Sequence, residues 1–464
     1  MKEGNVKNTM HVTEGLAKFA SKLTYKKLPK EAVGWAKDAI LDCTGVALAG
    51  SQEEAGKIMA DYAKKAAGKP EAGVFAAGFK TSASEAALAN GTMAHALDYD
   101  DYALPNWTGH PTAPILPGIF ALGQRQKISG KELLLAYVVG FEVGARVGAY
   151  LGRGHYESGW HPTATYGTMG ATAACCNILK LDAARTRSAF GIASSEASGV
   201  RQNFGTMTKP LHCGLSSRNG IVAALLAEKG FTADTDAIEG AFGFGKVFLA
   251  NGNCDPAKSL KGLDETYLIV EHGISVKPYP CCAEAHRCLD AILFLIQKHD
   301  IRADDVESVE CRTSDMVPAI MIRHRPKTVE EAKFSMEYCM AVALLDREAG
   351  LKQFTAERVM ERKVQKLLTR VHYLHLPETS GYANMERYPE QVTVKLRNGE
   401  TYAHEVLTNK GKPGNRLSKA ELVAKYTACA EEAIPRKRID RSLEMLDRLE
   451  KLKDVGELMA VLCA

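Results

Sequence analysis

The stretch GKELLLAYVVGFEVGARVGAYLG, residues 130–152, decides the fold class of this sequence. Its apolar residues recur at intervals of three and four, as they do on the buried side of an α-helix. The stretch is long enough to cross a bilayer, but Glu142 and Arg146 interrupt it, and charged side chains are costly in lipid. We therefore predict a buried helix and no transmembrane segment.

The same helical periodicity extends outward from this stretch, from about residue 29 to residue 228, as in EAVGWAKDAILDCTGVALAG at residues 31–50. Glycine and alanine crowd ASEAALANGTMAHAL at residues 83–97 and TYGTMGATAACC at residues 165–176. Small side chains let helix backbones approach closely. We predict a compact, nearly all-helical first region.

The pattern changes near residue 267, where short β-branched runs typical of strands begin. These runs are YLIVEHGISVKPYP at 267–280 and VESVECRTS at 306–314. QVTVKLRNGETYAHEV at 391–406 predicts a hairpin, because Asn398 and Gly399 both tolerate positive φ. Helical patterns lie between the strands at residues 285–299 and 330–345.

The tail, at residues 418–449, returns to helical periodicity, and we expect it to pack back on the first region. The predicted fold class is mainly α. A large helical domain would be built from residues 1–266 and 409–464, and a smaller α+β lid domain from residues 267–408. A chain of 464 residues favours two domains over one.

Composition narrows the possible partners. A net charge of +4 is too mild to indicate a nucleic-acid surface, so we expect a small-molecule substrate. The first ten residues, MKEGNVKNTM, contain no apolar signal segment, and the twelve cysteines are spread along the whole chain. Reduced thiols in the cytoplasm fit this pattern better than a disulfide scaffold.

The first motif with chemical potential is HALDYDDYALPNWTGHPTAPILP at residues 95–117. It places His95, Asp98, Asp100, Asp101 and His110 at a predicted helix end and in the loop that follows, where side chains often face a cleft. The ordinary alternative for such an acidic run is a solvated helix end. Asp98 is the best candidate among the acids, because it follows the apolar residues of HAL.

The second motif, GWHPTATYGTMGATAACC at residues 159–176, carries His161 immediately before Pro162. Proline suits the first turn of a helix, and a helix N-terminus favours an anionic ligand. A single histidine is more often structural than catalytic, but here several polar motifs point to the same kind of site.

The third motif is SGVRQNFGTMTKPLHCGLSSRNGIVAALLA at residues 198–227, and it contains no acidic residue. Its basic candidates are Arg201, Lys209, His212 and Arg218. The alternative is a solvated run of charge, but the run borders a strongly apolar segment. Clustered cations suit a substrate with two or three carboxylates, and their mutual repulsion would favour a neutral Lys209 that acts as a base.

Two further segments carry candidates. KPYPCCAEAHRCLDAIL at residues 277–293 brings Cys281, Cys282 and His286 to the start of a predicted helix. Metal binding is the rival interpretation, but the sequence has no CxxC pair, no HExxH and no spaced set of three cysteines. Tyr338 lies on an otherwise apolar helix, where a core phenol is the alternative to a catalytic one.

Motifs of other enzyme classes are absent. The sequence has no GxGxxG behind a strand, no GxxxxGK[ST] and no GxSxG. Dinucleotide, phosphate-loop and serine hydrolase functions therefore lack their main support.

Taken together, HALDYDDY, GHPTAPILP, GWHPTATYGTMGA, GTMTKPLHCGLSSRNG and KPYPCCAEAH resemble the MmgE/PrpD family in their order and separation. The resemblance extends from about residue 13 to residue 460. The family contains 2-methylcitrate dehydratases, cis-aconitate decarboxylases and iminodisuccinate epimerases. It implies a helical domain built from both chain ends, an α+β lid, a homodimer, and catalysis without a metal or an organic cofactor.

Carried over by motif, the resemblance implies a pocket with six catalytic residues. These are Asp98, His110, His161, Lys209, His286 and Tyr338. Cys282 is the alternative to its neighbour His286, and His212 would support Lys209. Two departures stand out, because Tyr102 replaces the small hydroxyl of the family's DFDDT pattern and Arg201 is not expected from the decarboxylases. We expect both side chains to contribute to substrate binding.

The predicted first step is removal of a proton next to a substrate carboxylate by His161 or Lys209. Loss of a neighbouring hydroxyl would then make the enzyme a dehydratase, which we rank first. Reprotonation from the opposite face would make it an epimerase, and loss of a carboxylate a decarboxylase. A carboxylate-binding protein that has lost catalysis is the non-enzymatic alternative, although a binder has little use for paired bases.

Overall fold

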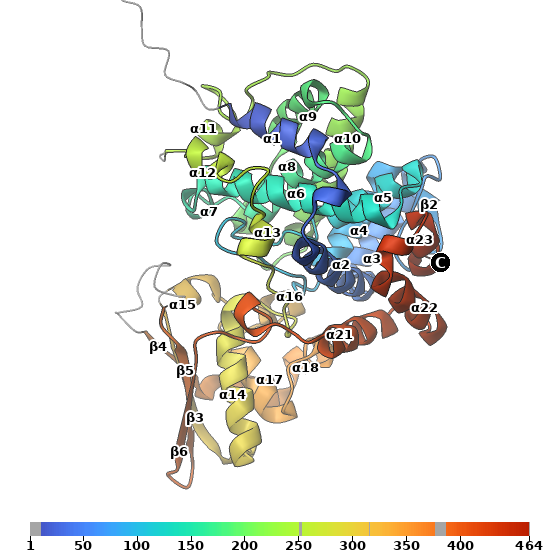
Figure 1. Ribbon diagram of the computed structural model, residues 1–464. Helices are drawn as coiled ribbons and strands as arrows, with labels where there is room; N and C mark the ends of the chain where they lie inside the picture. The colour runs from blue at the N-terminus through green and yellow to red at the C-terminus, as the bar shows by residue number, and fades with distance from the viewer. Residues whose placement is uncertain (1–10, 250–252, 315, 376–386, 464) are drawn as a thin grey trace, which may run out of the picture.

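The computed structural model describes residues 11–249, 253–314, 316–375 and 387–463, and it is mainly α-helical with a small α+β part. In Figure 1 most of the helices form the upper part of the molecule, and the lower part contains a four-stranded sheet with further helices beside it. The predicted fold class is confirmed. The prediction that the chain begins without a signal segment concerns residues 1–10, which lie outside the described residues.

The upper part, called the helical body here, is built from both ends of the chain. Its longer helices are α1 (Val12–Lys22), α2 (Lys30–Gly50), α3 (Glu54–Lys65), α4 (Ala83–His95), α5 (Leu116–Gln126), α6 (Gly130–Leu151), α8 (Pro162–Ile178), α9 (Ala183–Glu196), α10 (Thr208–Glu228), α21 (Lys419–Glu431), α22 (Arg436–Asp447) and α23 (Val455–Cys463). The short helices α7 (Gly154–Glu157), α11 (Phe244–Phe248), α12 (Pro256–Leu260) and α13 (Leu268–Glu271) connect them. α21 packs against α2 and α23 against α5, so the C-terminal helices return to the body as predicted.

The lower part, called the sheet region here, contains a sheet with strand order β4-β3-β5-β6. Its strands are β3 (Val306–Thr313), β4 (Val371–His375), β5 (Glu390–Leu396) and β6 (Thr401–Val406). β5 and β6 form the predicted antiparallel hairpin, in which Gly399 has a φ of +91°. α14 (His286–His299) packs on β5 and β6 and contacts α17 (Met336–Asp346).

Three local predictions need correction. The run at 267–280 is not a strand, because it contains α13 and its strand-like pairing is limited to an isolated bridge between Ser275 and Tyr102. The helix predicted over 330–345 is split into α16 (Val329–Ala332) and α17, since the Ser335 side chain caps α17. β4 was not predicted and pairs in parallel with β3.

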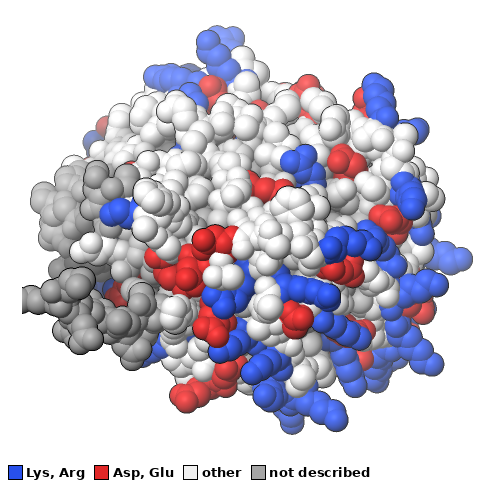
Figure 2. Space-filling model, turned by 90° about the horizontal axis from the view of Figure 1, so that it is seen from above, with Lys and Arg blue, Asp and Glu red and all other residues white. Residues whose placement is uncertain are grey.

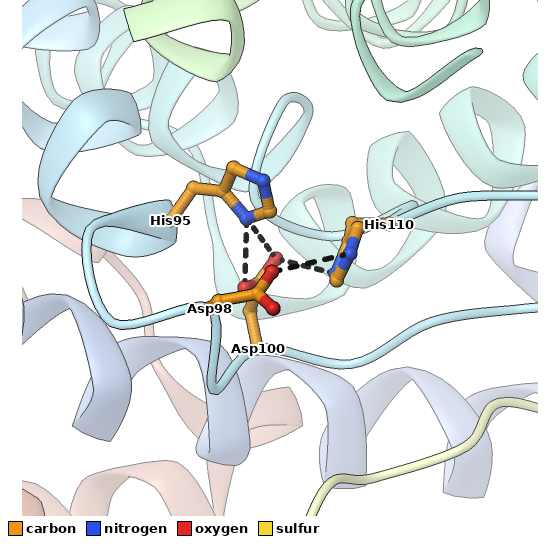
Figure 3. Close-up of side chains that lie close together, drawn as sticks. All are labelled: His95, Asp98, Asp100 and His110. Carbon is orange, nitrogen blue, oxygen red and sulfur yellow. Dashed lines mark hydrogen bonds and ion pairs between the residues drawn. The ribbon is translucent and has the colours of Figure 1, made fainter. Parts of the chain in front are cut away.

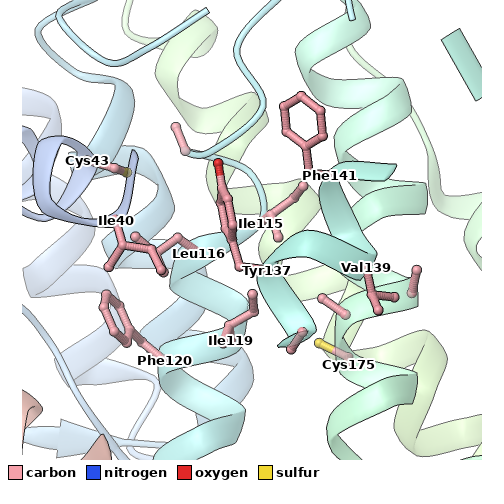
Figure 4. Close-up of a cluster of buried hydrophobic side chains, with 14 of the residues drawn as sticks. Ile40, Cys43, Ile115, Leu116, Ile119, Phe120, Tyr137, Val139, Phe141 and Cys175 are labelled. Atoms are coloured by element: carbon pink, nitrogen blue, oxygen red, sulfur yellow. The ribbon is translucent and has the colours of Figure 1, made fainter. Parts of the chain in front are cut away.

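The buried apolar residues form two large clusters. One draws on the helical body, from Val12 to Val276 and from Leu422 to Cys463, and Figure 4 shows a part of it around Tyr137. The other runs from Cys281 to Leu396 in the sheet region. Each part therefore has its own core, and the domain boundaries at 266 and 408 stay predictions.

Close helix crossings lie at the predicted small-residue segments. A Cβ atom on Gly91 of α4 would lie 2.7 Å from the Cα atom of Gly214 on α10. A Cβ atom on Gly140 of α6 would lie 2.8 Å from the carbonyl oxygen of Gly170 on α8. Any side chain at these positions would push the helix backbones apart.

α6 is long and apolar enough to cross a bilayer, but 89% of its most apolar window is buried inside the protein. It packs against α8 and α2 inside the helical body, which agrees with the predicted buried helix. All twelve cysteines are free in the structure, and eleven of them are buried. On the face that Figure 2 shows, basic side chains gather toward one side, with acidic side chains among them.

Candidate active site

A pocket lies between the helical body and the sheet region, and the sequence motifs meet in it. The residues that line it are Asp98, Tyr102, Leu104, Thr108, Gly109, His110, Tyr156, His161, Thr163, Phe204, Lys209, Lys277, Cys282, Ala283, Glu284, Ile320 and Phe334. Six of the ten predicted site residues are therefore in one pocket: Asp98, Tyr102, His110, His161, Lys209 and Cys282.

Asp98 is the centre of charge in the pocket. It follows α4 in the left-handed region, with a φ of +50°, and is only 5% exposed. The Lys209 ammonium donates to Oδ1, and the Lys277 ammonium lies 3.2 Å from Oδ2. Burial alone would raise the pKa of Asp98, but Lys209 and Lys277 hold that pKa well below its usual value. One carboxylate is thus shared by two ammonium groups, which both lie at the pocket surface.

Asp100 lies beneath Asp98 and binds two histidines (Figure 3). His95 Nδ1 lies 2.8 Å from Asp100 Oδ1, and His110 Nδ1 lies 3.1 Å from Asp100 Oδ2. His110 Nε2 also lies 3.7 Å from Asp98 Oδ1. Burial would raise the pKa of Asp100, but the two histidines hold it far below its usual value. Asp100 therefore orients both imidazoles as an anion.

The acidic run is not a solvated helix end. Asp100 and Asp101 are fully buried, and Asp101 accepts a hydrogen bond from the Thr112 hydroxyl. Burial raises the pKa of Asp101 well above its usual value despite that bond. Asp101 thus favours its neutral form, whereas Asp98 and Asp100 are charged.

His161 precedes Pro162, the first residue of α8, as predicted. Its Nδ1 lies 3.0 Å from Nδ1 of His212, so one imidazole donates and the other accepts. Burial lowers the pKa of His161 well below its usual value, and the nearby Lys209 ammonium lowers it further. Burial likewise lowers the pKa of His212 to about 4. Both imidazoles are neutral at pH 7, and a neutral imidazole can accept a proton.

The surroundings of Lys209 differ from the prediction. We expected neighbouring cations from its own segment, but its nearest charged partner is Asp98. Its ammonium also lies 5.2 Å from the ring centres of Phe204 and Phe334. Charge pairing with Asp98, rather than repulsion among cations, dominates at this lysine.

The two arginines of the same segment are not among the pocket-lining residues. Arg201 stacks on the Tyr156 ring at 3.7 Å and donates to the Tyr156 carbonyl oxygen at 3.0 Å, so it supports the pocket wall from behind. Arg218 donates to the Asn219 side chain farther along α10. Neither guanidinium extends into the pocket as expected for a group that binds substrate.

His286 and Tyr338 are also outside the pocket lining, because both belong to the core of the sheet region. His286 is fully buried, and its Nε2 lies 3.3 Å from the Cys281 carbonyl oxygen. The Tyr338 hydroxyl donates to the carbonyl oxygen of Gln353. The sheet region instead contributes Cys282, Ile320 and Phe334 to the pocket. Burial raises the pKa of Cys282 to about 12, which keeps the thiol protonated.

Lys277 is the main residue that the sequence analysis missed. It is 1% exposed, lines the pocket and contacts Asp98. A signal was present, since a lysine that interrupts an apolar run is expensive to bury without a carboxylate partner. His95 and Asp100 were noted in the first motif but were not predicted as site residues. In the structure they lie next to Asp98 and His110.

His95, Asp98, Asp100 and His110 could in principle hold a metal ion, since one ligand atom from each lies within 4.8 Å of the others. However, both oxygens of Asp98 face ammonium groups. A divalent cation placed there would be repelled by Lys209 and Lys277. The charge arrangement favours a site that works without a metal.

Comparison with known proteins identifies the family to which this sequence is similar. The MmgE/PrpD N-terminal domain matches residues 14–257 and the MmgE/PrpD C-terminal domain matches residues 279–451. The chain is 28% identical over 464 residues to cis-aconitate decarboxylase of Mus musculus, covering 97% of this chain and 93% of the relative. It is 28% identical over 465 residues to the Homo sapiens enzyme of the same name, covering 97% and 94%. A cis-aconitate decarboxylase of Aspergillus terreus is 26% identical over 479 residues, covering 97% and 96%.

Proposed function

This chain belongs to the MmgE/PrpD family, and on that basis we propose that it is a lyase acting on a di- or tricarboxylate without a metal or an organic cofactor. One observation carries the proposal: Asp98, His161, Lys209 and Lys277 converge in one buried pocket. The ammonium groups of Lys209 and Lys277 would bind a substrate carboxylate, and apolar walls would exclude water from it.

Decarboxylation is the first candidate reaction, because the named relatives are cis-aconitate decarboxylases. When CO2 leaves such an unsaturated acid, the electron pair of the broken carbon–carbon bond forms a new double bond. The former double-bond carbon then takes up a proton. Lys209 is the proposed proton donor, since it carries an ammonium group at the pocket surface.

Dehydration of a 2-methylcitrate-like acid is the second candidate, and the neutral state of His161 favours it. Dehydration begins with removal of a proton next to a carboxylate, which requires a base rather than an acid. The neighbouring hydroxyl would then leave as water with a proton from Lys209 or His110. Tyr102, which lines the pocket, would bind a substrate group in either reaction.

The test is incubation of the purified protein with cis-aconitate and with 2-methylcitrate in deuterium oxide. CO2 released from the first acid identifies a decarboxylase, and a new conjugated double bond absorbing in the ultraviolet, formed from the second acid, identifies a dehydratase. Deuterium next to a carboxylate without either product indicates an epimerase. If none of these signals appears with any polycarboxylate, the protein is a binder and the proposal is wrong.

We propose in addition that the protein is a homodimer, as its family resemblance implies. Large apolar side chains on the helical body support this, since Phe231, Phe242 and Val247 are 58%, 95% and 58% exposed. Apolar side chains grouped at a surface often mark an interface. Sedimentation velocity should give a dimer for the wild type and a monomer for Phe242→Glu. A monomeric wild type would exclude this assembly.

A further inference from the structure

The loop that carries Asp98 is held through its backbone by three buried lysines from separate parts of the chain. Lys333 Nζ donates to the Ala96 carbonyl oxygen at 3.1 Å. Lys277 Nζ donates to the Asp98 carbonyl oxygen at 2.6 Å, and Lys425 Nζ to that of Tyr99 at 2.9 Å. These lysines are 2%, 1% and 7% exposed, respectively.

The three lysines reach the loop from three directions. Lys333 follows α16 in the sheet region, and Lys425 lies on α21, close to the C-terminal end of the chain. Lys277 lies in the segment that connects the helical body to the sheet region. Lys277 also lines the active-site pocket, and Lys333 lines an adjoining pocket that shares Asp98, Lys209 and Phe334 with it. Lys425 is not among the lining residues of either pocket and acts on the loop from behind.

The backbone of this loop needs such support. Asp98 has a φ of +50°, which an L-residue with a side chain adopts only at an energetic cost. A carbonyl that accepts a hydrogen bond from an ammonium group is held more firmly than one bound to a neutral donor. Three such bonds across residues 96–99 would fix the direction in which the Asp98 carboxylate points.

Ordinary charge pairing does not account for all three lysines. Lys425 has a full partner, because its Nζ lies 2.6 Å from Asp42 Oδ1. Lys333 Nζ lies 3.9 Å from Glu53 Oε2, so the Ala96 carbonyl oxygen, at 3.1 Å, is the nearer acceptor. Burying a lysine against a carbonyl oxygen costs free energy. A role in fixing the conformation of the Asp98 loop would explain why Lys333 is buried there.

We propose that Lys333 and Lys425 are positioning residues that fix the Asp98 loop, so that the sheet region and the C-terminal helix together set the geometry of the site. The inference rests on the proposed function for its catalytic consequence. Its structural part, the ordering of the loop, stands independently of the reaction.

The test uses Lys333→Met and the double variant Asp42→Asn/Lys425→Met, which removes the Lys425 ammonium without leaving a buried charge unpaired. Hydrogen exchange of the backbone amides at 96–103, measured without substrate, should become faster in both variants. With substrate, kcat should fall by about 10²-fold while KM changes little, since a small misplacement of a reacting group has an effect of that order. Lys333→Arg should recover part of the lost kcat.

Lys37→Met is the matched control. Lys37 Nζ also donates to the backbone carbonyl oxygen of Asp447 and to the carboxylate of Glu450, but it does not touch the loop. It should leave loop exchange and kcat unchanged. Loop exchange that stays at the wild-type rate in both loop variants, or that rises equally in the control, would overturn the positioning role. An inactive wild type would reject the proposed function alone, because amide exchange still tests the loop.

Discussion

The helical body and the sheet region face each other across the pocket, and they contribute different chemistry to it. The body supplies Asp98, His110, His161 and Lys209, all at helix ends or in the loops next to them. The sheet region supplies mainly apolar wall, while its own polar candidates bond within its core. The reacting groups are therefore concentrated on the helical body, and the opposite wall shapes the space around them.

The largest expected effect is on the body side. Lys209→Met should lower kcat/KM with the active polycarboxylate by about 10²- to 10³-fold, because it removes a buried charge aimed at the substrate. Steady-state kinetics on the purified variant provides the measurement. Lys298→Met, an exposed lysine on α14, is the control and should match the wild type. Equal losses in the two variants would mean that Lys209 has no special role.

The second prediction concerns acid stability, which the buried histidines of the body should control. Burial lowers the pKa of His155 from 6.5 to about 4. Between those pH values the unfolded chain binds more protons at this residue than the folded chain, so stability falls as the pH falls from about 6.5 to 4. A shift of this size corresponds to about 3 kcal/mol, an upper value for one residue.

His155→Gln should therefore lose less free energy of unfolding than the wild type over that pH range. Denaturant titrations at several pH values measure it. His299→Gln, an exposed position in the sheet region, is the control and should follow the wild-type pH dependence. A His155→Gln profile parallel to that of the wild type would show that this histidine does not cause acid sensitivity.

The third prediction tests whether Tyr338 belongs to the core or to the reaction. Tyr338→Phe removes the hydrogen bond to the Gln353 carbonyl oxygen, and we expect a loss of about 1 kcal/mol in the free energy of unfolding. Activity should stay within a few-fold of wild type, because the hydroxyl bonds inside the sheet region. A large fall in kcat with unchanged stability would restore the catalytic role predicted from the motif.

The smallest expected effect is that of a chelator. Incubation with a strong chelator, followed by gel filtration, should leave the turnover rate unchanged, since ammonium groups occupy both sides of Asp98. Loss of activity that zinc restores would show that the carboxylates and histidines of the body hold a metal after all.

The comparison of the two regions also shows what could be predicted from sequence. Helical periodicity predicted the helical body, and the hairpin signal predicted two strands of the sheet, because both signals are local patterns in the sequence. His161 and Lys209 could be found since each lies at a helix start with a clear signature. The partner of Lys209 could not, because Asp98 lies 111 positions away in sequence and nothing local encodes that contact.

The predictions for the sheet region were weaker for a physical reason. Periodicity places Tyr338 on a helix but does not say whether its hydroxyl finds an acceptor in the core or in a pocket. The sequence around Lys277 has the pattern of a strand. In the structure, however, this residue lies in an irregular segment after α13. The burial of this lysine is explained by its ion pair with Asp98, which the sequence alone does not reveal.

The crossing of α4 and α10 at Gly91 and Gly214 has a consequence for protein engineering. Both helices lead directly to reacting groups, so an added methyl at either glycine would separate the Asp98 loop from Lys209. The opposite wall carries no such restriction at Ile320, which is only partly buried. A designer seeking a new acid specificity should therefore diversify that wall and leave the glycine crossing untouched.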